Sequence, residues 1–316
     1  MTIYKLSRSA MKILLAAMLL GASSNSSYAL DMAITVDDLP IFGSVNKEFE
    51  PYTIAQLFLD AFRKFNLQEV YGFINAQQLE SFPSSQRVLL SWLNAGQLLG
   101  NHTYSHLNLD HVSADEYITD IRKNDPLLKQ LMPHKNYHYF RYPFLEEGTN
   151  STKHTMVRQY LDHAGYQVAE VTIDFSDWVW DHAFFRCLRK KNQEKIAWLQ
   201  QTYLEEAIQS LEIGKILADS LFHRQPKHIF LMHIGAFQAM MLQDLLRTLQ
   251  NHDVHFITLD EAMSDPIYKL RPMLKQKRTD AFLTQIRMSR RAAIPPAVLA
   301  LAKRSYEGRV HLACKH

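Results

Sequence analysis

Residues 30–40 read LDMAITVDDLP, an apolar run that ends in the acidic pair Asp37-Asp38. Its apolar part, Met32–Val36, has the composition and length of a buried strand. Two carboxyl groups directly after a buried strand are notable, because parallel α/β folds collect their functional groups at the carboxyl ends of the strands. Further functional groups are therefore expected at the carboxyl ends of the other strands.

The remaining chain alternates short apolar runs with amphipathic stretches of helical period, which predicts a parallel α/β architecture. Strands are expected at Met32–Val36, Glu69–Ile74, Gln97–Gly100, Tyr137–Phe140, Tyr166–Ile173, His228–Met232 and Val254–Ile257. Helices are expected at Thr53–Phe65, Gln86–Ala95, Ala114–Arg122, Thr152–His163 and Phe237–Gln250. A longer helical stretch, Asn192–Phe222, exceeds what a crossover needs and is interpreted as an insertion or a lid, within a region near residues 179–227.

The composition indicates a globular protein with an export signal. Of the 316 residues 47% are hydrophobic, 21% are charged and 10 are Gly, which excludes collagen-like and globally disordered chains. Three basic residues precede the apolar run Ile13–Ala22, and Ser27-Tyr28-Ala29 forms a small-x-small site, so residues 1–29 are interpreted as a signal peptide cleaved after Ala29. The run is too short for a transmembrane anchor, which needs about 20 apolar residues. The protein is expected in the periplasm or outside the cell.

The C-terminal part differs in charge from the body. Residues 267–316 hold 12 Lys and Arg against 2 Asp and Glu, whereas the rest of the chain is net acidic. We interpret residues 30–266 as the main domain and residues 267–316 as a basic extension. The extension is either a solvated tail or a contact to an anionic membrane or cell-wall polymer, and we do not expect nucleic acid as a partner. A further alternative is that Phe282, Leu283 and Ile286, spaced for one helical face, pack onto the body.

Two cysteines, Cys187 and Cys314, are too few for a disulfide scaffold or a cysteine metal site. The sequence leaves open whether they pair with each other.

Side chains that can ionise or bind a metal follow several of the predicted strands. Beyond Asp37-Asp38, the strand ends lead into the segments Asn101–His106, Arg141–Phe144, Asp174–Trp178 and His233. The His-x-x-x-His spacing of His102 and His106 carries little weight alone, because 15 His in 316 residues produce such pairs by chance, as His134/His138 shows. Its place after a strand matters more. Two imidazoles and a carboxylate from another strand end would make a facial metal site with open positions.

These segments resemble, in order and spacing, the five motifs of the polysaccharide deacetylases, also called the NodB-homology or carbohydrate esterase family 4 enzymes. The matching residues are Thr35–Asp38, His102–His106, Arg141–Phe144, Asp174–Trp178 and Leu231–His233. The resemblance covers roughly residues 30–263 and omits most of residues 179–227 and the basic extension. It implies a deformed (β/α) barrel with a helical insertion.

The resemblance also implies a role for each residue. Asp37 corresponds to the general base, and Asp38, His102 and His106 correspond to the ligands of a divalent metal, Zn²⁺ or alternatively Co²⁺. Arg141 would tether the base, and His233, held by Asp177, would be the general acid. The backbone N–H of Phe144 would donate to the oxyanion, and Trp178 and Leu231 would line the acetyl pocket.

The implied activity is metal-dependent removal of N-acetyl groups from an N-acetylated glycan, such as peptidoglycan, a chitin-like polymer or an exopolysaccharide. Three departures from the family pattern, Val36, Leu39-Pro40 and Ile234, remove no catalytic group but alter the rim of the site. Two alternatives remain open. The same groups could cleave an O-acetyl ester or a non-sugar amide, or the chain could be a catalytically silent glycan-binding protein.

Overall fold

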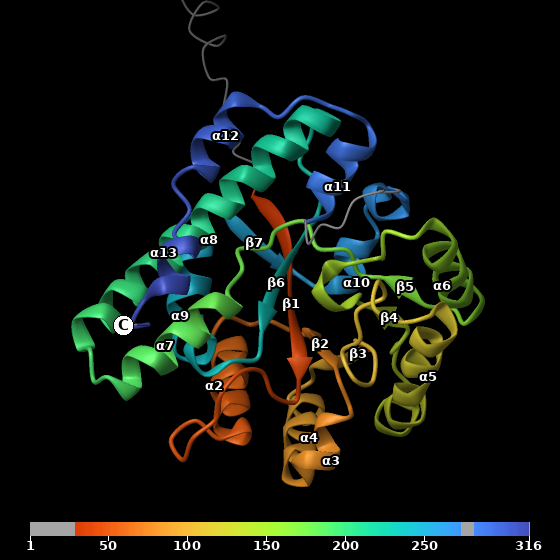
Figure 1. Ribbon diagram of the computed structural model, residues 1–316, viewed down its shortest axis with the longest axis horizontal. Helices are drawn as coiled ribbons and strands as arrows, with labels where there is room; N and C mark the ends of the chain where they lie inside the picture. Colours follow the sequence, from red (N-terminus) through yellow and green to blue (C-terminus); the bar gives the residue numbers. More distant parts are fainter. Residues whose placement is uncertain (1–28, 273–280, 316) are drawn as a thin grey trace, which may run out of the picture.

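The computed structural model describes residues 29–272 and 281–315, and the predicted signal peptide lies almost entirely outside them. Among these residues, seven parallel strands form the centre of the fold, in the order β5-β4-β3-β2-β1-β6, with β7 also paired to β1 (Figure 1). Their bounds are β1 Leu30–Leu39, β2 Tyr71–Ile74, β3 Leu98–Asn101, β4 Tyr139–Phe140, β5 Gln167–Val168, β6 His228–His233 and β7 Val254–Ile257. The predicted parallel α/β architecture is confirmed.

The two edges of the sheet are linked by the segment after β5. The N–H groups of Thr172 and Ile173 donate to the carbonyl of Ile229, and Leu231 N–H donates to the carbonyl of Ile173. Ile173 thereby forms a parallel bridge with Phe230 of β6. The strand predicted over Tyr166–Ile173 is therefore wrong in its extent, because the chain leaves β4 after Val168 and joins β6 at Ile173. This step closes the sheet into the deformed barrel.

Helices cover the outside of the sheet, and the predicted ones are present with shifted ends. Their bounds are α2 Pro51–Lys64, α3 Gln78–Ser81, α4 Gln86–Asn94, α5 Ala114–Leu131, α6 Ser151–His163, α7 Trp178–Arg189, α8 Gln193–Phe222, α9 Ala236–Gln250, α10 Leu259–Met263, α11 Phe282–Ser289, α12 Pro296–Ala302 and α13 Glu307–Leu312. The described part of the chain also contains the 3₁₀ turns η1 Pro83–Ser85, η2 Pro143–Leu145 and η3 Pro266–Lys269. Within the described residues, no helix combines the length and apolar character required to cross a membrane.

Local sequence sets several of these boundaries. Ser113 and Glu116 form a capping box at the start of α5, and the Asn150 side chain caps α6. Pro126 lies inside α5, which continues nine residues beyond the predicted end at Arg122.

The largest core cluster contains Phe58 and Phe62 of α2 and Trp92 of α4, whose rings pack edge-on or tilted against one another beside β1–β3.

The helical insertion packs against the barrel and the C-terminal helices and does not form a lid. Its long helix α8 packs against α7, α9, α11 and α12. At Gly214 a Cβ atom would lie 2.9 Å from the Ile173 side chain, so the helix approaches the closing segment of the barrel closely. Of the two interpretations, an insertion and a lid, the packing of α8 matches the insertion, because its apolar residues are buried between the barrel and the C-terminal helices.

The C-terminal helices pack onto the body. Phe282, Leu283 and Ile286 are 0%, 0% and 2% exposed, and Leu283 and Val298 share a cluster with Leu217 of α8. Figure 1 shows α11, α12 and α13 running along α8 toward α7. Of the alternatives considered for this extension, the structure matches the apolar packing and not a solvated tail.

Cys187 of α7 and Cys314, after α13, form a disulfide across 127 residues of sequence. The Arg186 guanidinium donates to the carbonyls of Val310, His311 and Ala313 beside it. The C-terminus is thus held covalently and by hydrogen bonds against α7.

Candidate active site

The end of β1 brings the acidic pair next to the strand that carries His233. Asp37 pairs with His233 in the parallel register of β1 and β6. Asp37 and Asp38 are only 2% and 7% exposed, and Asp38 has a positive φ of 66°. Two buried neighbouring carboxyl groups repel each other when both are ionised, so this arrangement requires compensating positive charge nearby.

The turn after β3 presents two imidazoles to Asp38. Asn101 holds this turn, because its Oδ1 accepts from Thr103 N–H at 2.9 Å and its amide donates to the Ile121 carbonyl. His102 Nε2 lies 3.5 Å and His106 Nε2 3.4 Å from Asp38 Oδ1. The two imidazoles and the carboxylate therefore converge on one point.

These three residues fit a divalent metal. Their ligand atoms all lie within 4.8 Å of one another, and the buried Asp38 Oδ1 has no hydrogen-bond partner among the described residues. His102 Nδ1 lies 2.8 Å from the Arg141 carbonyl, which leaves its Nε2 free for a ligand. Burial lowers the pKa of both imidazoles, and a metal ligand must be unprotonated.

Arg141 stands behind Asp37. Its Nη1 lies 3.2 Å and 3.3 Å from the two Asp37 carboxylate oxygens, while Nη2 donates to Thr35 and Nε to the Ala169 carbonyl. Burial raises the pKa of Asp37 to about 6, against the opposing effect of the Arg141 charge. A carboxyl group with a pKa near 6 suits a base that works close to neutral pH.

On the other side of the cavity, Asp177 orients His233. The His233 ring Nδ1 lies 2.6 Å from Asp177 Oδ1, and the His233 N–H donates to Oδ2 at 2.9 Å. Burial alone would lower the pKa of His233, but the Asp177 carboxylate, helped by Asp38 and Asp37, raises it to about 10. His233 is therefore protonated at neutral pH.

A cavity of about 470 Å³ contains these groups. The residues predicted from sequence that line it are Asp37, Asp38, His102, His106, Phe144, Trp178, Leu231 and His233, and Arg141 and Asp177 lie buried behind them. Sequence reasoning gave no cavity role to Phe42, Leu145, Asp174, Ser176, His182 and Glu307. Asp174 and Ser176 lay within a motif segment, whereas Glu307 carried no sequence signal because it is far along the chain.

Several cavity residues have left-handed backbone. The φ angles of His106, Phe144, Leu145 and Ser176 are 56°, 60°, 56° and 54°. Non-glycine residues adopt this region at an energetic cost, and such residues cluster at functional sites. Phe144 also packs its ring on His106, with 4.5 Å between ring centroids. Trp178 lies at the start of α7 and not in the predicted loop after a strand.

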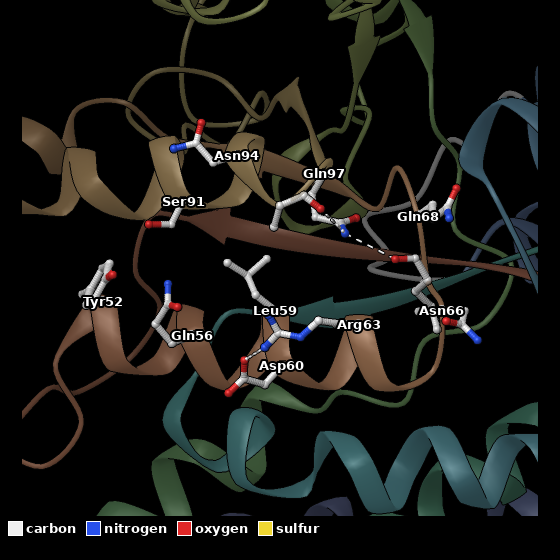
Figure 2. A pocket seen from close by; sticks show the side chains of 12 residues that line it. Tyr52, Gln56, Leu59, Asp60, Arg63, Asn66, Gln68, Ser91, Asn94 and Gln97 are labelled. Carbon is white, nitrogen blue, oxygen red and sulfur yellow. Dashed lines mark hydrogen bonds and ion pairs between the residues drawn. The ribbon is translucent and has the colours of Figure 1, made fainter.

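A second cavity of about 510 Å³ lies between α2 and α4 (Figure 2). Its lining is mainly polar, including Gln56, Ser91 and Asn94, and it reaches segments that precede β2 and β3. It lacks the paired acids and imidazoles of the first cavity. The groove at the carboxyl ends of the strands is therefore the candidate active site.

The deformed barrel and this group of side chains are those that the resemblance to the polysaccharide deacetylases implied, and comparison with known proteins agrees on the family and the fold. The family model "Polysaccharide deacetylase" matches residues 29–169, which confirms the family resemblance. A peptidoglycan-N-acetylglucosamine deacetylase of Bacillus cereus is 28% identical over 148 residues, 47% of this chain and 46% of that protein. A chitin deacetylase of Arthroderma benhamiae is 24% identical over 150 residues, 47% of this chain and 38% of that protein. The chain thus matches less than half the length of these relatives.

Solved structures support the fold. A wild-type pseudoenzyme of carbohydrate esterase family 4 from Bacillus anthracis has a TM-score of 0.52 at 15% identity, over 75% of this chain and 66% of that one. A mutant pseudoenzyme of that family with restored activity gives 0.51 at 16% identity, over 75% and 68%. Asp177, Trp178, Leu231 and His233 were included in the motif resemblance but lie beyond the family match at residue 169. In the structure Trp178, Leu231 and His233 line the same cavity as Asp37, and Asp177 is buried behind His233.

Proposed function

We propose that the protein is a metal-dependent hydrolase that removes N-acetyl groups from an N-acetylated glycan. The observation that carries this proposal is the convergence of three features in one cavity. These are the Asp38, His102 and His106 donor set, the Asp37–Arg141 pair and the Asp177–His233 pair. They supply a cation site, a base and an acid, the three functions that amide hydrolysis needs.

Each group has a task in the proposed reaction. Asp38, His102 and His106 would hold Zn²⁺ or Co²⁺, which when bound would acidify water and polarise the acetyl carbonyl. Asp37 takes the proton of the attacking water, and Arg141 fixes its carboxylate. The Phe144 N–H donates to the oxyanion, and His233 protonates the departing amine. Trp178 and Leu231 enclose the acetyl methyl group.

We place the protein outside the cytoplasm. The predicted signal peptide supports this location, and so does the Cys187–Cys314 disulfide, because disulfides persist mainly in oxidising compartments. Contact of the basic residues with an anionic surface stays a prediction.

Acetate release tests the activity. We expect the protein to release acetate from at least one of chitooligosaccharides, poly-N-acetylglucosamine and peptidoglycan, with acetylated xylan as the ester control. Chelation should abolish release and Zn²⁺ or Co²⁺ restore it, because the water depends on the ion for its acidity. His102→Ala should lose metal by elemental analysis, whereas His134→Ala should retain it. Undiminished turnover by verified metal-free protein would exclude the metal-hydrolase assignment. No acetate release from any of these substrates would favour a glycan-binding role.

The pH profile tests the acid. His233 must be protonated to donate, and its pKa of about 10 keeps it so across neutral pH. Activity should therefore fall as pH rises toward this value. In Asp177→Asn the carboxylate that raises the pKa is absent, so the alkaline limb should move to lower pH. The variant should lose more activity at pH 8 than at pH 6, and an unmoved alkaline limb would contradict the assignment of His233.

A further inference from the structure

The C-terminal segment contributes to the wall of the active-site cavity. Glu307, the first residue of α13, lines the cavity together with Trp178 and His182 of α7. It lies 270 positions from Asp37 in sequence and outside the family match. The motifs that point to the predicted cavity residues therefore give no indication of Glu307.

The placement of Glu307 is held from both sides. Before it, Glu206 of α8 accepts from the Ser305 hydroxyl and the Tyr306 N–H, each at 2.7 Å. After it, Arg186 binds three carbonyls of the segment, and Cys314 is joined to Cys187. These contacts anchor α13 against α7, so the exposed Glu307 carboxylate is not on a free tail.

The negative charge of Glu307 is not balanced by a Lys or Arg side chain in the cavity. Asp37 faces Arg141, Asp177 faces His233, and Asp38 belongs to the donor set. Glu307 has no ion-pair partner among the described residues, and no Lys or Arg lines the cavity. Asp174 is the other unpaired acid of this wall. Burial raises its pKa, and the charge of Glu307 is among those that raise it further, so the two carboxyl groups lie within electrostatic reach.

We propose that Glu307, supported by Asp174, is a specificity-determining residue that favours glycans with a positively charged amino sugar beside the N-acetyl group under attack. This inference rests on the proposed function and names its substrate class. An ammonium group supplies the missing positive charge, whereas the carboxylate of a muramic acid unit would be repelled. The preferred substrate is therefore a partly deacetylated glucosamine polymer, so one round of reaction produces a better substrate for the next.

Substrate ratios and direct binding test this proposal with the metal-loaded full chain. The wild type should show a higher kcat/KM for tetrasaccharides that carry one glucosamine than for fully acetylated ones, and the lowest for muramic acid-containing glycans. Glu307→Gln should reduce the ratio of kcat/KM for the glucosamine-containing substrate to that for the fully acetylated one about fivefold. The change should come from KM, and its size is that expected for the loss of one partly exposed charge interaction. Glu307→Asp should restore part of this ratio. The matched control Glu194→Gln, an exposed acid at the start of α8, should keep the wild-type ratio.

A binding measurement separates this proposal from the proposed function. The glucosamine tetrasaccharide has no acetyl group and is not hydrolysed. Its affinity for the protein, measured by titration calorimetry, is therefore independent of turnover. The tetrasaccharide should bind wild type more tightly than Glu307→Gln, with a difference that shrinks at high salt. Equal affinity and an unchanged substrate ratio in Glu307→Gln would overturn the role of Glu307. If acetate is released without any charge preference, the hydrolase survives and the specificity proposal fails.

Discussion

Asp37→Asn is expected to lower the rate of acetate release by about 10²–10⁴-fold while the protein keeps its metal. The asparagine preserves the size of the side chain and can still contact Arg141, but it cannot accept the proton of the attacking water. Because Asp37 is not in the donor set of Asp38, His102 and His106, metal content should remain at the wild-type level. Elemental analysis of the purified variant, measured beside its turnover, checks both parts.

Asp38→Asn provides the matched comparison, because it makes the same chemical change one residue along the chain. This variant should lose both metal and activity, since Asp38 Oδ1 is the buried, unpartnered oxygen that faces both imidazoles. Added metal should not restore turnover at concentrations that saturate the wild type. If the two variants exchange phenotypes, base and ligand have been assigned in reverse.

Truncation after Pro266 is expected to destabilise the protein by several kcal/mol. Burial of Phe282, Leu283 and Ile286 stabilises by about 1.5–3 kcal/mol for each side chain, and the disulfide contributes about 2–4 kcal/mol. These contributions approach the whole stability of a typical domain, about 5–15 kcal/mol. The truncated chain should therefore unfold at a much lower denaturant concentration or aggregate. If the truncated protein kept the wild-type unfolding midpoint and its activity on short substrates, residues 267–316 would be an extension that is dispensable for folding and catalysis.

Two milder variants keep this prediction measurable if the truncated chain does not fold. Cys187→Ser with Cys314→Ser should cost about 2–4 kcal/mol, because the unfolded chain regains the freedom of a long loop. Phe282→Ala should cost about 3–5 kcal/mol as a large-to-small core substitution. The exposed residue Leu299 of α12 gives the control, and Leu299→Ala should change the free energy of unfolding by less than about 0.5 kcal/mol. Denaturant unfolding curves compare all three.

Strand ends were the most predictable part of this protein. β7 was predicted with its observed ends, and β1, β2, β3 and β6 within one to three residues, because buried parallel strands are short apolar runs. The acids and imidazoles after those runs were found for the same reason. The strand over Tyr166–Ile173 failed, because hydrophobic pattern does not tell whether a run pairs with β4 or crosses to β6. The helix α7, with Trp178 at its start, was not predicted as a separate element, although it lies almost entirely within the helical insertion predicted near residues 179–227.

The sequence by itself determined the parallel α/β architecture and the chemical groups that follow its strands, because period and strand-end residues are local properties of the chain. The deformed barrel was predicted from the resemblance to the polysaccharide deacetylases. The tertiary structure alone decided that Cys187 pairs with Cys314, that α11 and α12 pack against α8, and that Glu307 lines the cavity of the candidate active site. Net charge and composition describe a segment in isolation. Where the segment packs depends on the apolar surface of helices that are distant in sequence. No local feature of the segment's own sequence identifies those helices.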